Sequence, residues 1–378
     1  MTQEGEKGMG LKSLFSSETD LSAQVLPVLD GFSHPTLQQP LSTLNALKQA
    51  SLRRGELTVR LQMPFAWQSG FIALQQAIDA ALLQLPDVRQ VRWVLEYQIA
   101  TLKRANEQPG VKGVKNIIAV SSGKGGVGKS STSVNLALAL AAEGAKVGLL
   151  DADIYGPSIP LMLGSEDQRP TSPDGQHMVP VSAHGIVANS IGYLVDQDSA
   201  TIWRGPMASR ALGQLLNETW WPDLDYLVID MPPGTGDIQL TLSQQTPVTA
   251  ALVVTTPQDV ALLDAAKGIA MFEKVHVPVL GLVENMSMHI CSQCGHHEAI
   301  FGTGGAARLA EKYHAELLAQ IPLHIRLRED LDNGTPTVVA APESEFALIY
   351  RQLAAKIAAK MYWSGESIAT EIAVRNIS

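Results

Sequence analysis

The sequence has few cysteines, no excess of positive charge and no long apolar run, and each shortage argues against a class of protein. Only two of its 378 residues are cysteines, so a disulfide framework is not expected, and the pair is better suited to metal or redox chemistry. The net charge of -9 disfavours non-specific binding of nucleic acid. No run approaches the ~20 apolar residues of a membrane-spanning helix. We therefore expect neither nucleic acid nor membrane among the partners.

The beginning of the sequence also lacks a targeting segment. Its first residues mix both signs of charge and contain no apolar core of roughly 7–15 residues, as a secretory signal would. A cytoplasmic location is therefore expected. Hydrophobic residues make up 46% of the chain, which is ordinary for a globular protein with a real core. The length suggests two domains, or one large and one small.

Residues 109–113, Pro-Gly-Val-Lys-Gly, are predicted to form a linker between two differently patterned regions. Residues 1–108 are predicted to form a small α+β domain. Its expected elements are a helix and turn from residues 35–40 onwards, a strand at 58–63, a helix at 70–85 and a strand at 88–95.

After the linker, strand-like apolar runs alternate with helical segments. The expected strands are 116–121, 146–151, 225–230, 249–255, 279–284 and 316–321. The expected helices are 131–143, 260–273, 305–313 and 345–361. Runs that are apolar throughout are typical of a parallel sheet covered on both faces. Residues 114–363 therefore predict a doubly wound α/β domain with a mostly parallel sheet, followed by a short tail at 364–378.

A phosphate-binding loop is the most specific motif in the chain. Residues 123–130, Gly-Lys-Gly-Gly-Val-Gly-Lys-Ser, match G-x-x-x-x-G-K-[ST] between an expected strand and helix. Glycines allow backbone N–H groups to surround phosphate oxygens, a lysine reaches the β/γ-phosphates and a serine hydroxyl ligates Mg²⁺. The residues expected to contact ATP are Gly123, Lys124, Gly125, Gly126, Val127, Gly128, Lys129, Ser130 and Ser131. Lys124 is an additional lysine, and its alternatives are a solvated loop charge or a second phosphate contact, made within its own subunit or to a partner subunit.

Carboxylates follow two of the expected strands, at the sheet edge where ligands of open α/β sheets bind. Asp151 and Asp153 end one strand, and either side chain is placed to face the γ-phosphate, position water or hold Mg²⁺. The alternative role is a helix or turn cap. Asp230 follows the apolar run Tyr-Leu-Val-Ile, a Walker B pattern in which the carboxylate meets Mg²⁺.

Two further segments are expected near the nucleotide. Residues 231–237, Met-Pro-Pro-Gly-Thr-Gly-Asp, resemble a loop that senses ATP against ADP, with Asp237 contacting the nucleotide, although a rigid turn is the alternative. Asn285 is expected to end a strand, where its amide is suited either to the adenine edge or to a cap.

The two cysteines form the motif Cys291-Ser-Gln-Cys294. Two thiolates are half of a four-ligand site, so a Cys₄ centre needs a second copy of the chain, as a two-fold dimer provides. A Cys₂His₂ zinc site using His289, His296 or His297 is a second interpretation, although these histidines lie very close in sequence. A thioredoxin-like redox pair is a third.

Taken together, these motifs resemble the Mrp/ApbC family of iron–sulfur cluster carriers. The resemblance is carried by residues 123–130, 151–160, 230–237 and 285–286 together with the cysteine pair, and it covers about residues 114–340. The family belongs to the deviant Walker A branch of P-loop ATPases, alongside MinD- and ParA-like proteins. The N-terminal region looks like the small iron–sulfur assembly domain often fused to bacterial Mrp proteins.

This resemblance implies an ATP-hydrolysing homodimer that holds a labile [4Fe–4S] cluster between its subunits, on Cys291 and Cys294, and passes it to apo-proteins. Lys124 would then reach the partner's nucleotide, Lys129 would be the ordinary P-loop lysine and Asp153 would position water. Ser130 and Asp230 would hold Mg²⁺. A MinD/ParA-like positioning ATPase and a zinc-bridged metal-trafficking ATPase remain the alternatives, although the tail is short and not basic, unlike that of most positioning ATPases.

Overall fold

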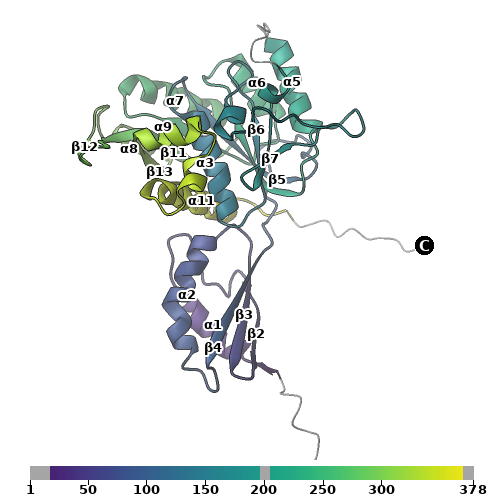
Figure 1. Cartoon of the computed structure of the whole chain (residues 1–378), viewed down its shortest axis with the longest axis vertical. Coiled ribbons are helices and arrows are strands. Elements are labelled where there is room, and N and C mark those ends of the chain that lie inside the picture. The colour runs from purple at the N-terminus through teal and green to yellow at the C-terminus, as the bar shows by residue number, and fades with distance from the viewer. Residues whose placement is uncertain (1–17, 196–204, 369–378) are drawn as a thin grey trace, which may run out of the picture. The chain divides into compact units, whose positions relative to one another are not determined.

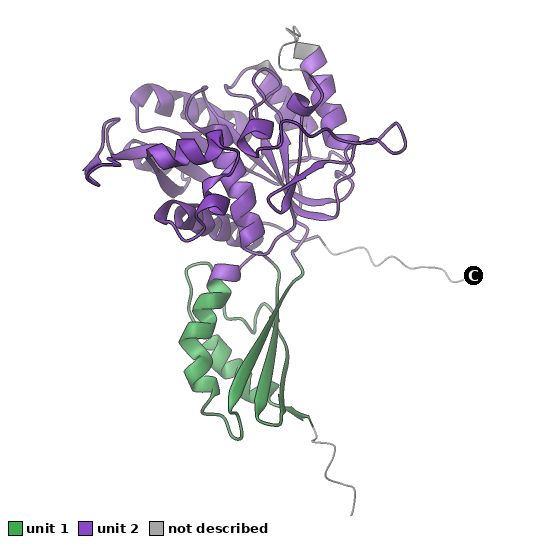
Figure 2. Ribbon diagram, in the orientation of Figure 1, with its two compact units in different colours: residues 1–64, 70–98 green, residues 65–69, 99–378 purple. Residues whose placement is uncertain are grey.

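The computed structural model describes residues 18–195 and 205–368, and these divide into two compact units. The first unit comprises the residues up to 64 together with 70–98, and the second comprises 65–69 and the residues from 99 onwards (Figure 2). Residues 99–108, expected in the small domain, therefore group with the second unit. The reason is that this segment bonds to it: the Leu102 N–H donates to Asn116 Oδ1 at 3.0 Å and the Ala105 N–H to the Val248 carbonyl at 2.9 Å.

The first unit contains one four-stranded sheet and two helices. The strands lie in the order β1 (Thr19–Asp20), β2 (Leu47–Arg53), β3 (Glu56–Met63) and β4 (Gln90–Tyr97). The helices α1 (Ser22–Asp30) and α2 (Gln68–Leu82) lie on one side of this sheet (Figure 1). Alternate residues of β3, from Leu57 to Met63, are buried, whereas those between them are partly exposed. One face of the sheet thus forms the core with the helices, and the other remains open.

The elements predicted in this unit at 58–63, 70–85 and 88–95 correspond to β3, α2 and β4. The helix expected after residue 35 is wrong, because residues 34–45 contain turns and no helix. Prolines at both ends of the Pro35–Pro40 segment remove backbone donors and fix φ, which favours turns there.

The second unit is built on a mixed, mostly parallel sheet of nine strands. Its order is β12-β11-β10-β5-β9-β6-β8-β7, and β13 pairs with β11 outside this path. Only β7 and β12 run antiparallel to their neighbours. The bounds are β5 Val114–Ser122, β6 Val147–Asp151, β7 Val181–Ala183, β8 Ile186–Ser190, β9 Leu224–Asp230, β10 Ala250–Thr255, β11 Val279–Ile290, β12 His297–Glu298 and β13 Leu317–Leu323.

Helices cover both faces of this sheet, so the predicted doubly wound α/β fold is confirmed (Figure 1). Alternate residues of β5 point to opposite faces. Ile117 and Ala119 share a core with α5, α7 and α8, whereas α3 packs against α11 and over β6 and β9. The bounds are α3 Lys129–Ala142, α4 Ile159–Met162, α5 Gly205–Asn217, α6 Asp237–Gln245, α7 Asp259–Lys274, α8 Gly305–Lys312, α9 Ile325–Asp332, α10 Thr337–Ala340 and α11 Glu345–Ser364.

The segment after α11 pairs with the beginning of the second unit. The Lys103 N–H donates to the Glu366 carbonyl and the Ile368 N–H to the Thr101 carbonyl, both at 2.8 Å. The remainder of the expected tail, residues 369–378, lies outside the described residues. Among the helices that the structure describes, none has both the length and the apolar character needed to cross a bilayer.

Candidate nucleotide and cysteine sites

The glycine-rich loop joins the end of β5 to the start of α3. Gly126 and Gly128 both have φ of 80°, a left-handed conformation that favours glycine. A Cβ atom added at Gly125 or Gly126 would meet no atom within 4 Å, so the loop backbone is open on this side. At Gly128, an added Cβ would lie 2.0 Å from Asn285 Nδ2, so the loop and β11 approach each other closely there. The loop can therefore present its N–H groups to an anion at the start of α3.

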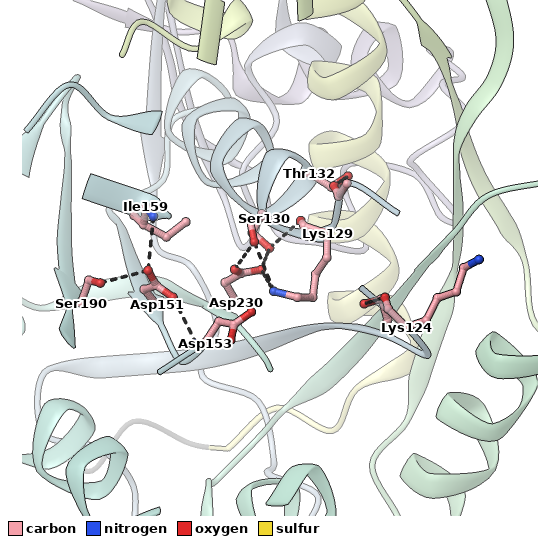
Figure 3. A network of polar contacts seen from close by, with 12 residues as sticks. Lys124, Lys129, Ser130, Thr132, Asp151, Asp153, Ile159, Ser190 and Asp230 are labelled. Carbon is pink, nitrogen blue, oxygen red and sulfur yellow. Dashed lines mark hydrogen bonds and ion pairs between the residues drawn. The ribbon is translucent and has the colours of Figure 1, made fainter. Parts of the chain in front are cut away.

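Asp230, at the end of β9, is the centre of a buried polar cluster (Figure 3). The Lys129 ammonium lies 2.7 Å from Asp230 Oδ1. The Ser130 hydroxyl donates to Oδ2 at 2.6 Å, and the Ser133 hydroxyl donates to Oδ1 at 2.7 Å. All four residues belong to β9 or to the first two turns of α3. The structure therefore brings together the predicted lysine, serine and Walker B aspartate.

This set of groups fits Mg²⁺ and a nucleotide phosphate. Ser130 and Asp230 offer two oxygen ligands of the kind that Mg²⁺ prefers, already in contact with each other. Lys129 offers a positive charge that is only 6% exposed, so it acts in a poorly solvated environment. Its ion pair with Asp230 means that a phosphate and the carboxylate compete for the same ammonium.

The two aspartates after β6 occupy different environments. Asp151 is fully buried and accepts hydrogen bonds from the Ser190 hydroxyl at 2.9 Å and from the Ile159 N–H at 3.2 Å. Burial raises the pKa of Asp151 to about 7, and the charge of Asp230 acts in the same direction. Asp153 is half-buried beside the cluster, and burial also raises the pKa of its carboxyl. Asp151 is thus held by the surrounding chain, whereas Asp153 remains accessible.

Lys124 is separate from the buried cluster. Its side chain points away from Lys129 and Asp230 (Figure 3), and its carbonyl accepts a hydrogen bond from the Ser122 hydroxyl at 2.8 Å. The local hydrogen bond fixes the backbone of the loop without using the ammonium group. The Lys124 ammonium therefore lies apart from the cluster formed by Lys129 and Asp230.

Asn285 supports the loop from β11. Its Nδ2 donates to the Val127 carbonyl at 2.9 Å. Contrary to the sequence-based expectation, Asn285 does not end the strand, because β11 continues to Ile290. The polar residues that follow Asn285 are partly exposed, so this stretch lacks the continuous apolar pattern of a buried strand. Asn285 also borders a cavity of ≈ 310 Å³ together with Gly128, Ser131, Met286 and residues from Pro322 to Asp332.

The loop after β9 lies against the end of β5. The Gly234 N–H donates to the Ser122 carbonyl at 2.9 Å, and Gln239 donates to the Pro233 carbonyl. Asp237 is the first residue of α6, and its side chain lies outside the part of the chain that the structure describes. The loop is therefore anchored next to the phosphate loop by backbone contacts.

The cysteines lie at the turn of a short hairpin between β11 and β12. The Cys291 N–H donates to the His296 carbonyl at 3.0 Å, and the Gly295 N–H donates to the Cys291 carbonyl at 2.8 Å. Cys291 is half-buried and Cys294 is exposed, and both are free thiols. Backbone N–H groups of Gln293 and Cys294 donate to the Cys291 sulfur and lower the pKa of its thiol. This arrangement favours the thiolate, which is the form that binds metal.

The histidines of the alternative zinc site do not complete it within one chain. His297 Nδ1 lies 3.2 Å from the Met288 sulfur, and the His296 carbonyl accepts the hydrogen bond from the Cys291 N–H. Among the described residues, no group of three or more histidine, cysteine, aspartate or glutamate side chains is arranged to hold a metal ion. His289, His296 and His297 therefore do not gather with the two thiols.

Two contributors to the site were not predicted from the sequence. Ser133 bonds Asp230 from α3, and Ser190 bonds Asp151 from the end of β8. A polar residue on the inner side of a helix after a phosphate loop is a usable signal for Ser133. No local signal identifies Ser190, because its contact depends on the pairing of β6 with β8.

The fold and the phosphate loop define a P-loop NTPase. A family model described as NUBPL iron-transfer P-loop NTPase matches residues 113–358. The iron–sulfur cluster carrier protein of Salmonella typhimurium is 67% identical over 369 residues, which cover 98% of this chain and 100% of the relative. That of Haemophilus influenzae is 67% identical over 358 residues, covering 95% and 97%. A nucleotide-binding protein from Archaeoglobus fulgidus, solved with ADP, is similar in structure, with TM-score 0.55 and 38% identity over 63% of this chain and 93% of that one.

The chain belongs to the Mrp/ApbC family of iron–sulfur cluster carriers, as the resemblance implied. The family model and these relatives thus agree on an iron–sulfur cluster carrier of the P-loop NTPase class.

Proposed function

We propose that this chain is an ATP-hydrolysing carrier that holds a [4Fe–4S] cluster between two identical subunits and delivers it to apo-proteins. The observation that carries the proposal is the hairpin turn, which carries one half-buried and one exposed free thiol and offers no third ligand among the described residues. A Cys₄ cluster then requires the same hairpin from a second copy, which a two-fold dimer supplies. Soft thiolates suit an iron–sulfur cargo better than they suit Mg²⁺.

In the proposed ATP site, Ser130 and Asp230 hold Mg²⁺ and Lys129 neutralises charge on the transferred phosphoryl group. Bound Mg²⁺ supplies further charge stabilisation at the phosphates. Asp153 positions water because it is the accessible carboxylate beside the cluster. Asn285 holds the loop through Val127 and borders the cavity that suits the nucleoside. The loop with Asp237 responds to the nucleotide state. The outward direction of Lys124 supports its action on the partner's nucleotide.

Anaerobic reconstitution with iron and sulfide tests the cluster assignment. The native protein should form a dimer with about four irons and four sulfides per two chains. Cys291→Ala and Cys294→Ala should each abolish retention of the cluster, read from the visible charge-transfer absorption and from sedimentation. ATP binding should remain in both variants, because the phosphate loop is formed by other strands, and it serves as the control for folding.

Transfer is tested by mixing the loaded dimer with an apo-protein that requires a [4Fe–4S] cluster and following the recovery of its activity. A monomer that keeps a full cluster, or a brown Cys291→Ala protein, would contradict the bridging site. Stoichiometric zinc without sulfide, under conditions that load a known cluster protein, would favour the zinc-bridged alternative.

A further inference from the structure

The open face of the sheet in the first unit carries a polar groove. In the register of the sheet, Ser51 pairs with Thr58 and Thr58 with Arg92, while Arg53 pairs with Glu56. Paired residues point to the same face, so short hydroxyl side chains form the floor and long side chains rise around it. The resulting open groove has a volume of ≈ 770 Å³ and is lined by residues of β2, β3 and β4.

Arginines dominate the rim of this groove. All arginines in the first 100 residues of the sequence line it, and they are Arg53, Arg54, Arg60, Arg89 and Arg92. The clustering is notable in a chain whose net charge is -9. A local positive patch on an acidic protein attracts a negatively charged partner to one place.

Three of these arginines have no internal anion. Arg60 pairs with Glu96, and Arg92 lies 4.0 Å from Glu56. Within residues 18–195 and 205–368, the guanidinium groups of Arg53, Arg54 and Arg89 make no ion pair or side-chain hydrogen bond. Their donors are therefore available to an external acceptor.

The same three arginines are held together by the β2–β3 hairpin. Arg54 and Gly55 have φ of 52° and 86°, as a tight turn between adjacent strands requires. The Arg89 N–H donates to the Gly55 carbonyl at 2.8 Å, which fixes the start of β4 beside this turn. Three arginines with unpaired guanidinium groups thus lie at the same end of the groove, around the β2–β3 turn.

We propose that this arginine groove binds an acidic segment of a partner polypeptide. Guanidinium groups form bidentate hydrogen bonds with carboxylates, and the hydroxyl groups of Ser51 and Thr58 can form hydrogen bonds with the peptide backbone. Single-stranded nucleic acid is a poorer fit, because the groove is lined by no aromatic ring on which bases could stack.

The chain's own N-terminal residues do not provide the required charge. Residues 1–17 contain two acidic and two basic side chains, Glu4, Glu6, Lys7 and Lys12. Such a balanced segment is a poor complement to three unpaired arginines, which favours a separate polypeptide as the occupant.

Binding is measured with the full chain and a fluorescent decaglutamate peptide, by anisotropy, in saturating Mg-ATP so that the phosphate loop is occupied. The test variant is Arg53→Gln with Arg54→Asn, since asparagine tolerates the positive φ at this position. The matched control, Lys48→Gln with Lys112→Gln, removes the same charge from exposed residues outside the groove. Arg89→Gln is an independent single variant that leaves the turn sequence intact.

The native chain should bind the peptide more weakly as salt rises, because the contacts are exposed. The test variant should lose about tenfold in affinity, Arg89→Gln about threefold, and the control less than about twofold. Equal losses in test and control variants, or no binding by the native chain, would overturn the proposal. Tighter binding of decathymidylate, with the same dependence on the arginines, would replace the acidic polypeptide with nucleic acid.

Discussion

At the scale of single residues, Lys129 and Asp230 balance each other's charge in the interior. Removing one partner leaves the other buried and poorly compensated, which costs more than the pair itself contributes. In the absence of nucleotide, Lys129→Met should therefore lower the free energy of unfolding by about 2–3 kcal/mol. This cost is at or below the low end for breaking a buried ion pair, because the hydroxyl groups of Ser130 and Ser133 still donate to Asp230. Adding Asp230→Asn should recover part of this loss while leaving ATP hydrolysis abolished. Urea unfolding of the single and double variants measures these free energies. A double variant less stable than Lys129→Met would contradict the pairing of Lys129 with Asp230.

Asp151 should make the stability of the folded chain depend on pH. Its pKa of about 7 in the folded chain lies above the ordinary value of 3.8, so the folded state binds a proton that the unfolded state releases. The stabilisation by this proton is present at low pH and is lost as pH rises towards 7 and above. The native chain, free of metal and nucleotide, should gain about 1 kcal/mol from this group between pH 8 and pH 6. Asp151→Asn should remove that difference, so equal pH dependence of the two proteins in urea unfolding would refute the assignment.

At the scale of elements, the phosphate loop depends on its close approach to β11. Gly128→Ala combines a positive φ with a Cβ only 2.0 Å from Asn285 Nδ2, whereas Gly126→Ala has the same φ and no neighbour within 4 Å. We expect Gly126→Ala to cost about 1–2 kcal/mol of stability and Gly128→Ala at least about 3 kcal/mol. Thermal unfolding of the two nucleotide-free variants measures the difference. Equal costs would show that the Asn285 amide or the loop moves aside at little cost, which would contradict a fixed contact between them.

The elements also show how far the sequence predicts this protein. Strand β10, most of β9 and the middle of β5 (residues 117–120) are apolar, so their burial in a parallel sheet was predictable. Strand β8, with sequence Ile-Val-Ala-Asn-Ser, is short and ends in polar residues, so it has no such pattern. The phosphate loop was predictable because its motif is local. The contact of Ser190 with Asp151 was not, because two segments far apart in sequence must pair before the residues meet.

At the scale of the whole molecule, the proposed dimer divides each ATP site between two chains. Variants Lys124→Ala and Asp153→Ala should each hydrolyse ATP poorly while keeping most nucleotide binding. If Lys124 acts on the partner's nucleotide, a mixed dimer contains one site with both residues intact. Mixing the two variants should therefore restore up to about a quarter of native activity, given random exchange of subunits into half mixed dimers. No recovery in a sample with demonstrated mixed dimers would exclude action across the interface.

Strand β11 connects the phosphate loop with the cysteine turn. Asn285 holds Val127 partway along the strand, and Cys291 directly follows the strand's last residue, Ile290. Between them, Met286 has φ of 55° and the pairing with β13 shifts before His289, so the strand is irregular there. Strand β11 therefore contacts the phosphate loop at Asn285 and leads directly into the cysteine turn, so the positions of the two sites depend on the same stretch of backbone.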